Sequence, residues 1–278
     1  MTKTTLKYII NNLLKNALDW YWRLAELPSS EPGEVSGMGK LETIALCKTN
    51  DPTKIIYKSA IALKLANLWQ LTPMDVAEKL ARSCRHEGIA TCRLDTPLAL
   101  ATHLEVKVVP PGLLLFELTD NSIAAWLQYF CESAPLSVGE RELPFLVPEH
   151  LFKIQYSHAR CCSLLRMADR DRILPLTDPN IFPRFNHPAE SRLISQFFQT
   201  WDFLYFPTVT PQEINWQKVA TALSEAFQNF YSQCRLWGEV KIDNPELTKG
   251  RLGLILITKY LLRFLLEEKL KIQAPTEL

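Results

Sequence analysis

The sequence predicts a mainly helical protein, with an α+β N-terminal domain followed by an all-α helical bundle. Alternating apolar residues, which are typical of strands, flank a Pro-Pro-Gly turn at 110–112 in the first half. The second half instead repeats apolar residues at helical spacing over long segments. Between the halves, residues 134–148 hold three prolines and a glycine without periodicity. We therefore expect domains at 1–133 and 149–278, joined by a linker at 134–148.

The first half is expected to begin with four segments, assigned from periodicity and turn residues: a helix at Leu6–Leu27, a loop at Pro28–Gly39, a short strand at Leu41–Leu46 and a helix at Lys54–Trp69. Thr72, with Pro73 and Asp75 after it, then has the pattern of a capped helix start. This pattern predicts a further helix that ends near Ser83.

Two strands and another helix complete the predicted N-terminal domain. His103–Val109 alternates polar and apolar residues, and Leu113–Leu118 follows as its partner strand. The intervening 110–112 suits a type II turn, because proline presets one φ angle and glycine supplies the positive one. Asp120 is placed to cap a helix that runs to Phe130.

The second half predicts four helices, which we place at Glu149–Asp169, Pro188–Leu204, Pro211–Trp237 and Pro245–Lys271. Thr210 and Glu213 flank Pro211 in the pattern of a capping box, so the third helix is expected to start there. Its apolar residues form one stripe at helical spacing: Val219, Leu223, Ala226, Phe227, Phe230 and Cys234.

Composition favours a globular cytoplasmic protein without a cofactor. Apolar residues make up 47% of the 278 residues and charged residues 22%, and the net charge of +1 includes no polybasic tail. The start of the chain lacks the pattern of a signal peptide, so the seven cysteines are expected to be reduced. Charged residues interrupt the most apolar stretch, Leu252–Leu270, which argues against a membrane span.

Metal and catalytic sites have little support among the residues. His158 and Cys162 lie one helical turn apart with Cys161 adjacent, but no second ligand pair follows at suitable spacing. Cys84, His86 and Cys92 similarly lack a fourth partner. A phosphate loop at 37–40 lacks the required spacing, and no Ser or Cys nucleophile stands in a recognisable catalytic setting. We expect no metal site and no enzymatic activity.

A run of arginines is the strongest candidate for ligand contact. Arginines recur on one predicted helix and after it, at Arg160, Arg166, Arg170, Arg172, Arg184 and Arg192. Such clusters bind phosphates through charge-assisted hydrogen bonds. The alternative is a solvated helix face that Asp169 and Asp171 partly neutralise. Three aromatic residues either stack unpaired RNA bases or belong to the core: Tyr156, Tyr231 and Trp237.

Three segments resemble arginyl-tRNA synthetases. The run Gln155–Leu165 (QYSHARCCSLL) is similar to the first helix of their DALR-type anticodon-binding domain. The segments EAFQNFYSQC (225–234), GRLGLILI (250–257) and IQAPTEL (272–278) resemble the last helices and the tail of that domain. Residues 56–80, with the PGLLLF run at 111–116, are similar to their N-terminal domain. The catalytic signatures H-I-G-H and K-M-S-K-S do not occur in the sequence.

The resemblance implies a non-catalytic protein that binds tRNA or another structured RNA through its helical domain, without DNA or membrane partners. The RNA-binding candidates are Gln155, Tyr156, His158, Arg160, Arg166, Arg170, Arg172, Tyr231 and Trp237. Leu115 stands where the family's N-terminal domain has an asparagine that reads the D-loop, and the tail lacks the family's arginine. A module that has lost RNA binding and docks a protein partner is therefore the alternative, and an enzyme with an unrecognised site is the third.

Overall fold

The computed structural model describes residues 4–24, 44–51, 53–87, 104–133, 149–175, 185–207 and 213–278. Its contacts divide the chain into two compact units, Thr4–Ser122 and Ile123–Leu278. We call them the sheet unit and the helical unit and describe each by itself. Together they confirm the predicted fold class, an α+β unit followed by a helical bundle.

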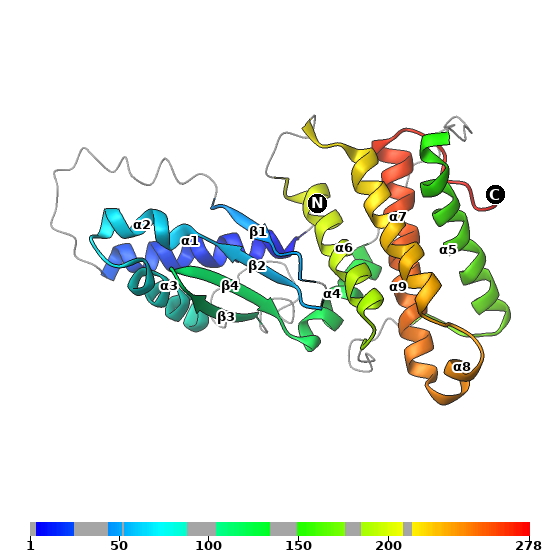
Figure 1. The fold of residues 1–278 in the computed structure, drawn as a ribbon, viewed down its shortest axis with the longest axis horizontal. Coiled ribbons are helices and arrows are strands. Elements are labelled where there is room, and N and C mark those ends of the chain that lie inside the picture. The colour runs from blue at the N-terminus through cyan, green and yellow to red at the C-terminus, as the bar shows by residue number, and fades with distance from the viewer. Residues whose placement is uncertain are drawn as a thin grey trace. The chain divides into compact units, whose positions relative to one another are not determined.

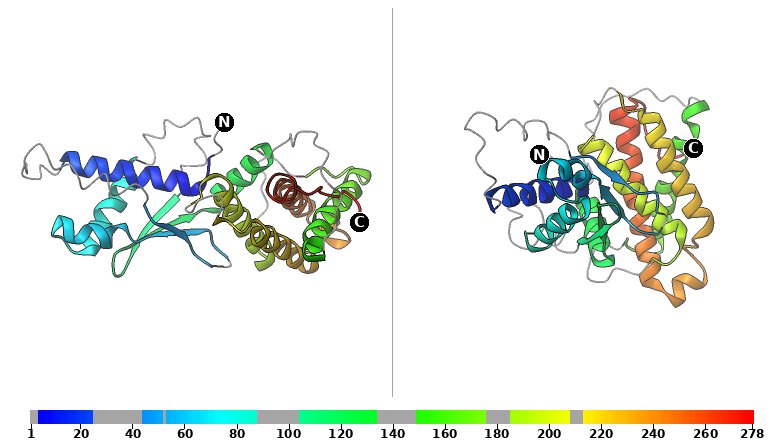
Figure 2. Two further views of the ribbon diagram at one scale, coloured as in Figure 1. Left: turned by 90° about the horizontal axis from the view of Figure 1, so that it is seen from above. Right: turned by 60° about the vertical axis from the view of Figure 1, so that its left-hand side comes forward.

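In its described residues, the sheet unit combines a four-stranded antiparallel sheet with helices (Figure 1). The strands are β1 (Leu46–Lys48), β2 (Ile56–Ser59), β3 (Leu104–Val109) and β4 (Leu113–Leu118), and the helices are α1 (Leu6–Leu24), α2 (Ile61–Trp69) and α3 (Pro73–Glu87). The strand order is β1-β2-β4-β3, with Tyr57 opposite Phe116 at the centre. Both of these aromatic side chains are fully buried, because α2 and α3 cover their face of the sheet (Figure 2).

The helix predicted at Lys54–Trp69 is wrong over its first residues. Ile56–Ser59 forms strand β2, and the helix begins only at Ile61. The residues of this strand alternate between a buried and a more exposed face, which is the period of a strand and not of a helix. β2 also pairs on both sides, and this tertiary pairing overrides the helical pattern of the following residues. The first strand also differs from its predicted range, since it begins at Leu46.

The predicted start of α3 is confirmed. The amide of Asp75 donates to Thr72 Oγ1 at 3.1 Å, and Pro73 is the first helical residue. The turn between β3 and β4 differs from the type II turn that the sequence suggested. The Gly112 amide donates to the Val109 carbonyl at 3.0 Å, and the peptide bond before Pro111 is cis, so the turn is type VI.

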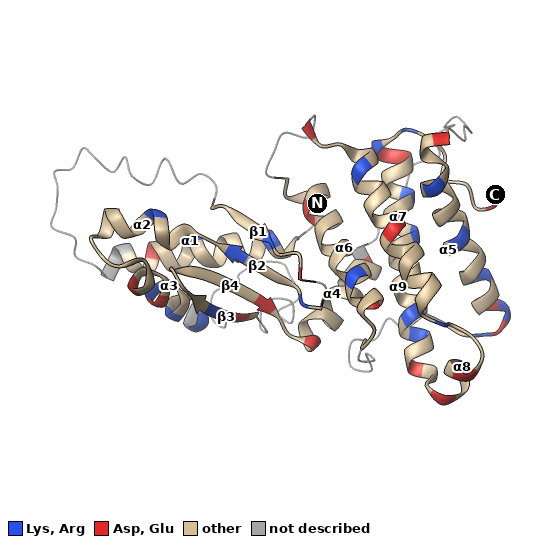
Figure 3. Cartoon of the chain, viewed as in Figure 1, with Lys and Arg blue, Asp and Glu red and all other residues tan. Residues whose placement is uncertain are grey.

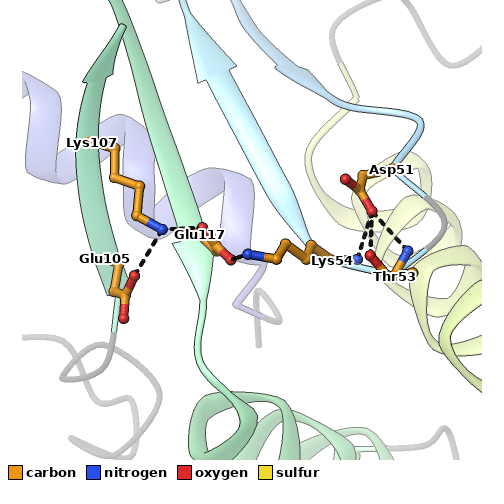
Figure 4. A network of polar contacts seen from close by, with 6 residues as sticks. All are labelled: Asp51, Thr53, Lys54, Glu105, Lys107 and Glu117. Atoms are coloured by element: carbon orange, nitrogen blue, oxygen red, sulfur yellow. Dashed lines mark hydrogen bonds and ion pairs between the residues drawn. The ribbon is translucent and has the colours of Figure 1, made fainter. Parts of the chain in front are cut away.

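The outer face of the sheet carries a ladder of charges (Figure 4). Glu105 and Glu117 lie directly opposite each other on β3 and β4, where two carboxylates would repel. The ammonium of Lys107 lies between them, 3.0 Å from Glu105 and 2.5 Å from Glu117, and Lys54 approaches Glu117 to 2.5 Å. The hydrogen bond from Lys107 is the main reason that the pKa of the Glu117 carboxyl is lowered, and the hydrogen bond from Lys54 lowers it further. Just before Lys54 in the sequence, Asp51 caps a turn by accepting the amide of Thr53 at 2.8 Å.

One edge of the sheet is tied to a helix. β3 ends the strand order on one side, and the guanidinium of Arg85 on α3 donates to the carbonyl of Val106. The two distances are 3.2 Å from Nε and 2.7 Å from an Nη atom.

The helical unit is a bundle of long helices that lie side by side in Figure 1. Its elements are α4 (Asp120–Ser133, from Ile123 onward), the short 3-10 helix η3 (Glu149–Leu151), α5 (Phe152–Arg170), α6 (Pro188–Tyr205), α7 (Trp216–Gln233), α8 (Glu239–Asp243), α9 (Pro245–Phe264) and the π-helical turn η6 (Leu265–Lys269). The stripe predicted on α7 faces the core, where Leu223, Phe227 and Phe230 are fully buried. α7 begins at Trp216 with Asn215 as its cap, so the start predicted at Pro211 is too early; residues 208–212 lie outside the described residues.

Helix α4 packs with the helical unit, although the sequence placed it in the N-terminal domain. Trp126 and Phe130 lie edge-on to Phe198 of α6, with ring centroids 5.6 and 5.2 Å apart, and Phe130 is 4.9 Å from Trp201. The contacts therefore divide after Ser122, eleven residues before the expected domain end. The linker expected at 134–148 lies outside the described residues, and the division at 133 and 149 stays a prediction.

A buried ion pair fastens the start of α6 to α9. Glu190 closes a capping box by accepting the His187 amide at 2.9 Å, and its other oxygen accepts Arg251 Nε at 2.7 Å. The side chains are 1% and 9% exposed, and Arg251 also donates to the Arg235 carbonyl at 2.6 Å. No helix among the described residues is long and apolar enough to cross a membrane.

Candidate nucleic-acid interface

Helix α5 carries most of the candidate residues, and its inner face is built from small polar groups. Ser157 is fully buried and lies 2.7 Å from Ser224 of α7, oxygen to oxygen. Gln228 donates to the same Ser157 oxygen at 2.8 Å, and Ser224 donates to the Lys153 carbonyl at 3.0 Å. Small side chains let α5 and α7 approach closely, and these hydrogen bonds satisfy the buried polar atoms.

The C-terminal tail packs against a second side of α5. Gln155 Nε2 donates to the Gln273 carbonyl at 3.2 Å, and His158 Nδ1 lies 2.7 Å from the Pro275 carbonyl. Gln155 is 0% exposed and His158 is 1% exposed. The sequence proposed both as RNA contacts, and the structure corrects this, because neither side chain reaches the surface. The residues that gave the run its resemblance fix the tail.

Burial determines the chemistry of the His158 environment. Desolvation lowers the pKa of His158 from 6.5 to about 4, so the ring is neutral at pH 7 and donates from Nδ1 to Pro275. Burial also raises the pKa of the Cys161 and Cys162 thiols. Cys162 Sγ lies 3.9 Å from Nε2 of the His158 ring. The described residues contain no group of three or more His, Cys, Asp or Glu that could hold a metal ion.

Arg160 is held by α7. Its guanidinium lies 4.8 Å from the centre of the Tyr231 ring and donates to the Tyr231 hydroxyl. Tyr231 in turn stacks on Phe227, at 6.2 Å between ring centres. Both Arg160 and Tyr231 are half-buried, so these two candidates mainly join α5 to α7.

The outer face of α5 is aromatic at its N-terminal end. Phe152 and Tyr156 stack at 6.0 Å with an interplanar angle of 27°, and they remain 47% and 41% exposed. Tyr156 is therefore a surface residue and not a core residue. The same face continues towards the C-terminal end of α5 with Ser163, Met167 and Arg170. These residues lie 7, 11 and 14 positions after Tyr156, which is close to a whole number of helical turns in each case. Sequence reasoning missed Phe152, although its position one turn before Tyr156 was the signal.

The C-terminal end of α5 is basic. Arg170 and Arg172 are exposed, and Figure 3 shows Lys and Arg along this helix. Arg166 is partly exposed, and both of its Nη atoms donate to the Thr276 carbonyl at 3.3 Å. Arg192 is exposed on α6, whereas Arg184 lies outside the described residues.

Asp171 is neutralised from the neighbouring loop and helix. Its carboxylate accepts Lys241 Nζ at 2.8 Å and Trp237 Nε1 at 3.3 Å. The hydrogen bond from Lys241 is the main reason that the pKa of the Asp171 carboxyl is lowered. Trp237 is half-buried. Because it contacts Asp171, which directly follows α5, it lies beside the basic end of that helix.

Most of the residues that form this site match a known protein family. The family model described as the DALR anticodon binding domain matches residues 154–278, which contain nearly all of α5, together with α6 to α9 and the tail. The helical unit thus carries a DALR anticodon-binding domain. The resemblance inferred from the QYSHAR run is confirmed over this segment. For residues 56–116 the resemblance stays a prediction.

The chain is also similar to arginine–tRNA ligases over its C-terminal part. The enzyme of Moorella thermoacetica is 33% identical over 114 residues, those of Pelodictyon phaeoclathratiforme and Gloeobacter violaceus are each 31% identical, and the three matches cover 40–41% of this chain. Each match covers 20% of the relative, so the chain spans about a fifth of the length of these curated relatives. No solved structure matches the chain.

Proposed function

We propose that this protein binds tRNA through the outer face of α5 and does not itself catalyse aminoacylation. The DALR match to residues 154–278 is the observation that carries the proposal, and the relatives over this segment are ligases that act on tRNA. The proposal of a non-catalytic role is supported by a sequence without the H-I-G-H and K-M-S-K-S signatures. We place the binding in the cytoplasm, where tRNA is found.

The geometry of α5 supports base stacking at its N-terminal end and phosphate contact at its C-terminal end. The exposed Phe152–Tyr156 stack offers an aromatic surface on which an unpaired base can stack, which is how proteins usually read RNA loops. Arg166 and Arg170 lie 10 and 14 residues further on, roughly 15–21 Å along the helix axis. At that distance their guanidinium groups would contact phosphates of the same RNA segment.

Two kinds of substitution distinguish the roles by their response to salt. The binding of a fluorescent arginine tRNA is measured by anisotropy, with the full chain, at several salt concentrations. Tyr156→Ala should weaken binding roughly 5- to 150-fold and leave the salt slope unchanged, because base stacking releases no counterions. Arg170→Ala should weaken binding and flatten the slope by about 0.7–0.9.

The sheet unit supplies the matched controls. Trp20 is an exposed aromatic residue of α1, and Lys64 is an exposed lysine of α2. Trp20→Ala and Lys64→Ala should leave tRNA binding unchanged. Failure of the full chain to bind tRNA at low salt would defeat the proposal and favour the protein-interaction alternative. Arginine-dependent ATP–pyrophosphate exchange above a buffer blank would contradict the non-catalytic role.

A further inference from the structure

The tail brings a carboxylate to the proposed RNA-binding face. Residues 272–278 follow η6, and Ile272, Ala274 and Pro275 are buried. The tail then emerges, so that Thr276 and Glu277 are exposed beside α5. The Glu277 side chain is 80% exposed, and its Oε1 lies 3.3 Å from an Nη atom of Arg166.

Arg166 is the residue at which the tail and the proposed RNA surface meet. Its Nη atoms already face the Thr276 carbonyl, and the Glu277 carboxylate lies against one of them. The Arg166 side chain is 45% exposed, so part of the guanidinium remains open to solvent. Among the described residues no ion pair is formed by Arg170, one turn further along α5. The tail therefore gives Arg166 a carboxylate partner, whereas Arg170 has none among the described residues.

We propose that Glu277 is an intramolecular competitor of RNA phosphate for Arg166, an inference that rests on the proposed function. Carboxylate and phosphate oxygens bind the same donor fork of a guanidinium, so an N–H group that donates to Glu277 is not free for a phosphate. The attachments of Gln155 to Gln273 and of His158 to Pro275 fix the tail backbone and keep the carboxylate near Arg166. Release of Arg166 needs only a movement of the exposed end of the tail.

The competition is graded and does not switch binding off. An exposed ion pair changes an equilibrium by roughly two- to fivefold. Glu277→Gln keeps the shape of the side chain and removes its charge, so it should strengthen tRNA binding by about that factor. The salt slope should steepen by up to about 0.9, because one more guanidinium exchanges counterions for a phosphate.

The test is a double-mutant cycle on the full chain with the same fluorescent arginine tRNA. It compares the wild type, Glu277→Gln, Arg166→Ala and the double variant. Glu225→Gln, which removes an exposed acid of α7, is the control for a general change in net charge. Competition predicts that Glu277→Gln tightens binding, that Glu225→Gln does so less, and that the gain disappears when Arg166 is absent. Thermal denaturation should show the same melting temperature for Glu277→Gln as for the wild type.

Each other outcome overturns the proposal. An equal gain from Glu225→Gln, or a gain that persists without Arg166, would mean that net charge and not competition is responsible. A wild type that binds tRNA no more weakly than Glu277→Gln would refute the competition and leave the proposed function intact. If neither protein binds tRNA at low salt, the proposed function fails and this inference fails with it.

Discussion

Protonation of His158 should make the helical unit sensitive to mild acid. The folded pKa is lowered to about 4 from 6.5, so the unfolded chain takes up the proton first as the pH falls. The stabilisation is therefore fully present above pH 6.5 and is lost between pH 6.5 and 4. At pH 4.5 the two values give a loss of about 2 kcal/mol relative to pH 7, since one pKa unit corresponds to about 1.4 kcal/mol.

The assay isolates this one group by comparison with a side chain that does not titrate. His158→Asn places an amide nitrogen near the position of Nδ1 and keeps a donor for the Pro275 carbonyl. Urea denaturation is followed by circular dichroism at pH 7 and at pH 4.5 for both proteins. The wild type should lose about 2 kcal/mol more than the variant, because the carboxylates that titrate in this range are common to both. The same loss in both proteins would refute the burial argument.

Three further substitutions test the packing. Gly112→Ala should cost about 1–3 kcal/mol, because φ is +129° and a Cβ atom would lie 2.7 Å from the carbonyl oxygen of Pro73; urea denaturation measures the loss. Ala159→Asp should cost about 3 kcal/mol or more by burying an unpaired charge, and an unchanged melting temperature would show that this face of α5 is exposed. Glu190→Gln should cost about 3–5 kcal/mol by leaving Arg251 buried without its partner, and partial recovery in the double variant with Arg251→Met would attribute that cost to the unpaired charge.

Local patterns were sufficient where one element decides its own structure. The hairpin of β3 and β4 was predicted because alternation and a turn occur together, and the start of α3 because Thr72 caps it locally. β2 was misread as helix because Ile56–Ser59 is too short for its period to stand out from the helix that follows. Its strand structure depends on pairing with β4, which is distant in the sequence.

The candidate site was predictable as a helix but not as a surface. The spacing of α5 indicates which residues share a face, but it does not indicate which faces the tail and α7 cover. Gln155 and His158 are buried because the tail, more than 110 residues later, crosses them. Tyr156 lies on the uncovered side, whereas the sequence left a core position and an exposed position open. Whether each of these neighbouring residues is buried or exposed depends on how α5, α7 and the tail pack together.

The contact between Arg85 and the Val106 carbonyl has a consequence for behaviour at high concentration. An outermost strand offers unpaired backbone groups to which a strand of another molecule can add, and such addition starts aggregation. On β3 one of these acceptors is already occupied by a charged side chain from α3. An intruding strand would have to displace Arg85 before it could extend the sheet, so this single arginine helps to keep neighbouring molecules apart.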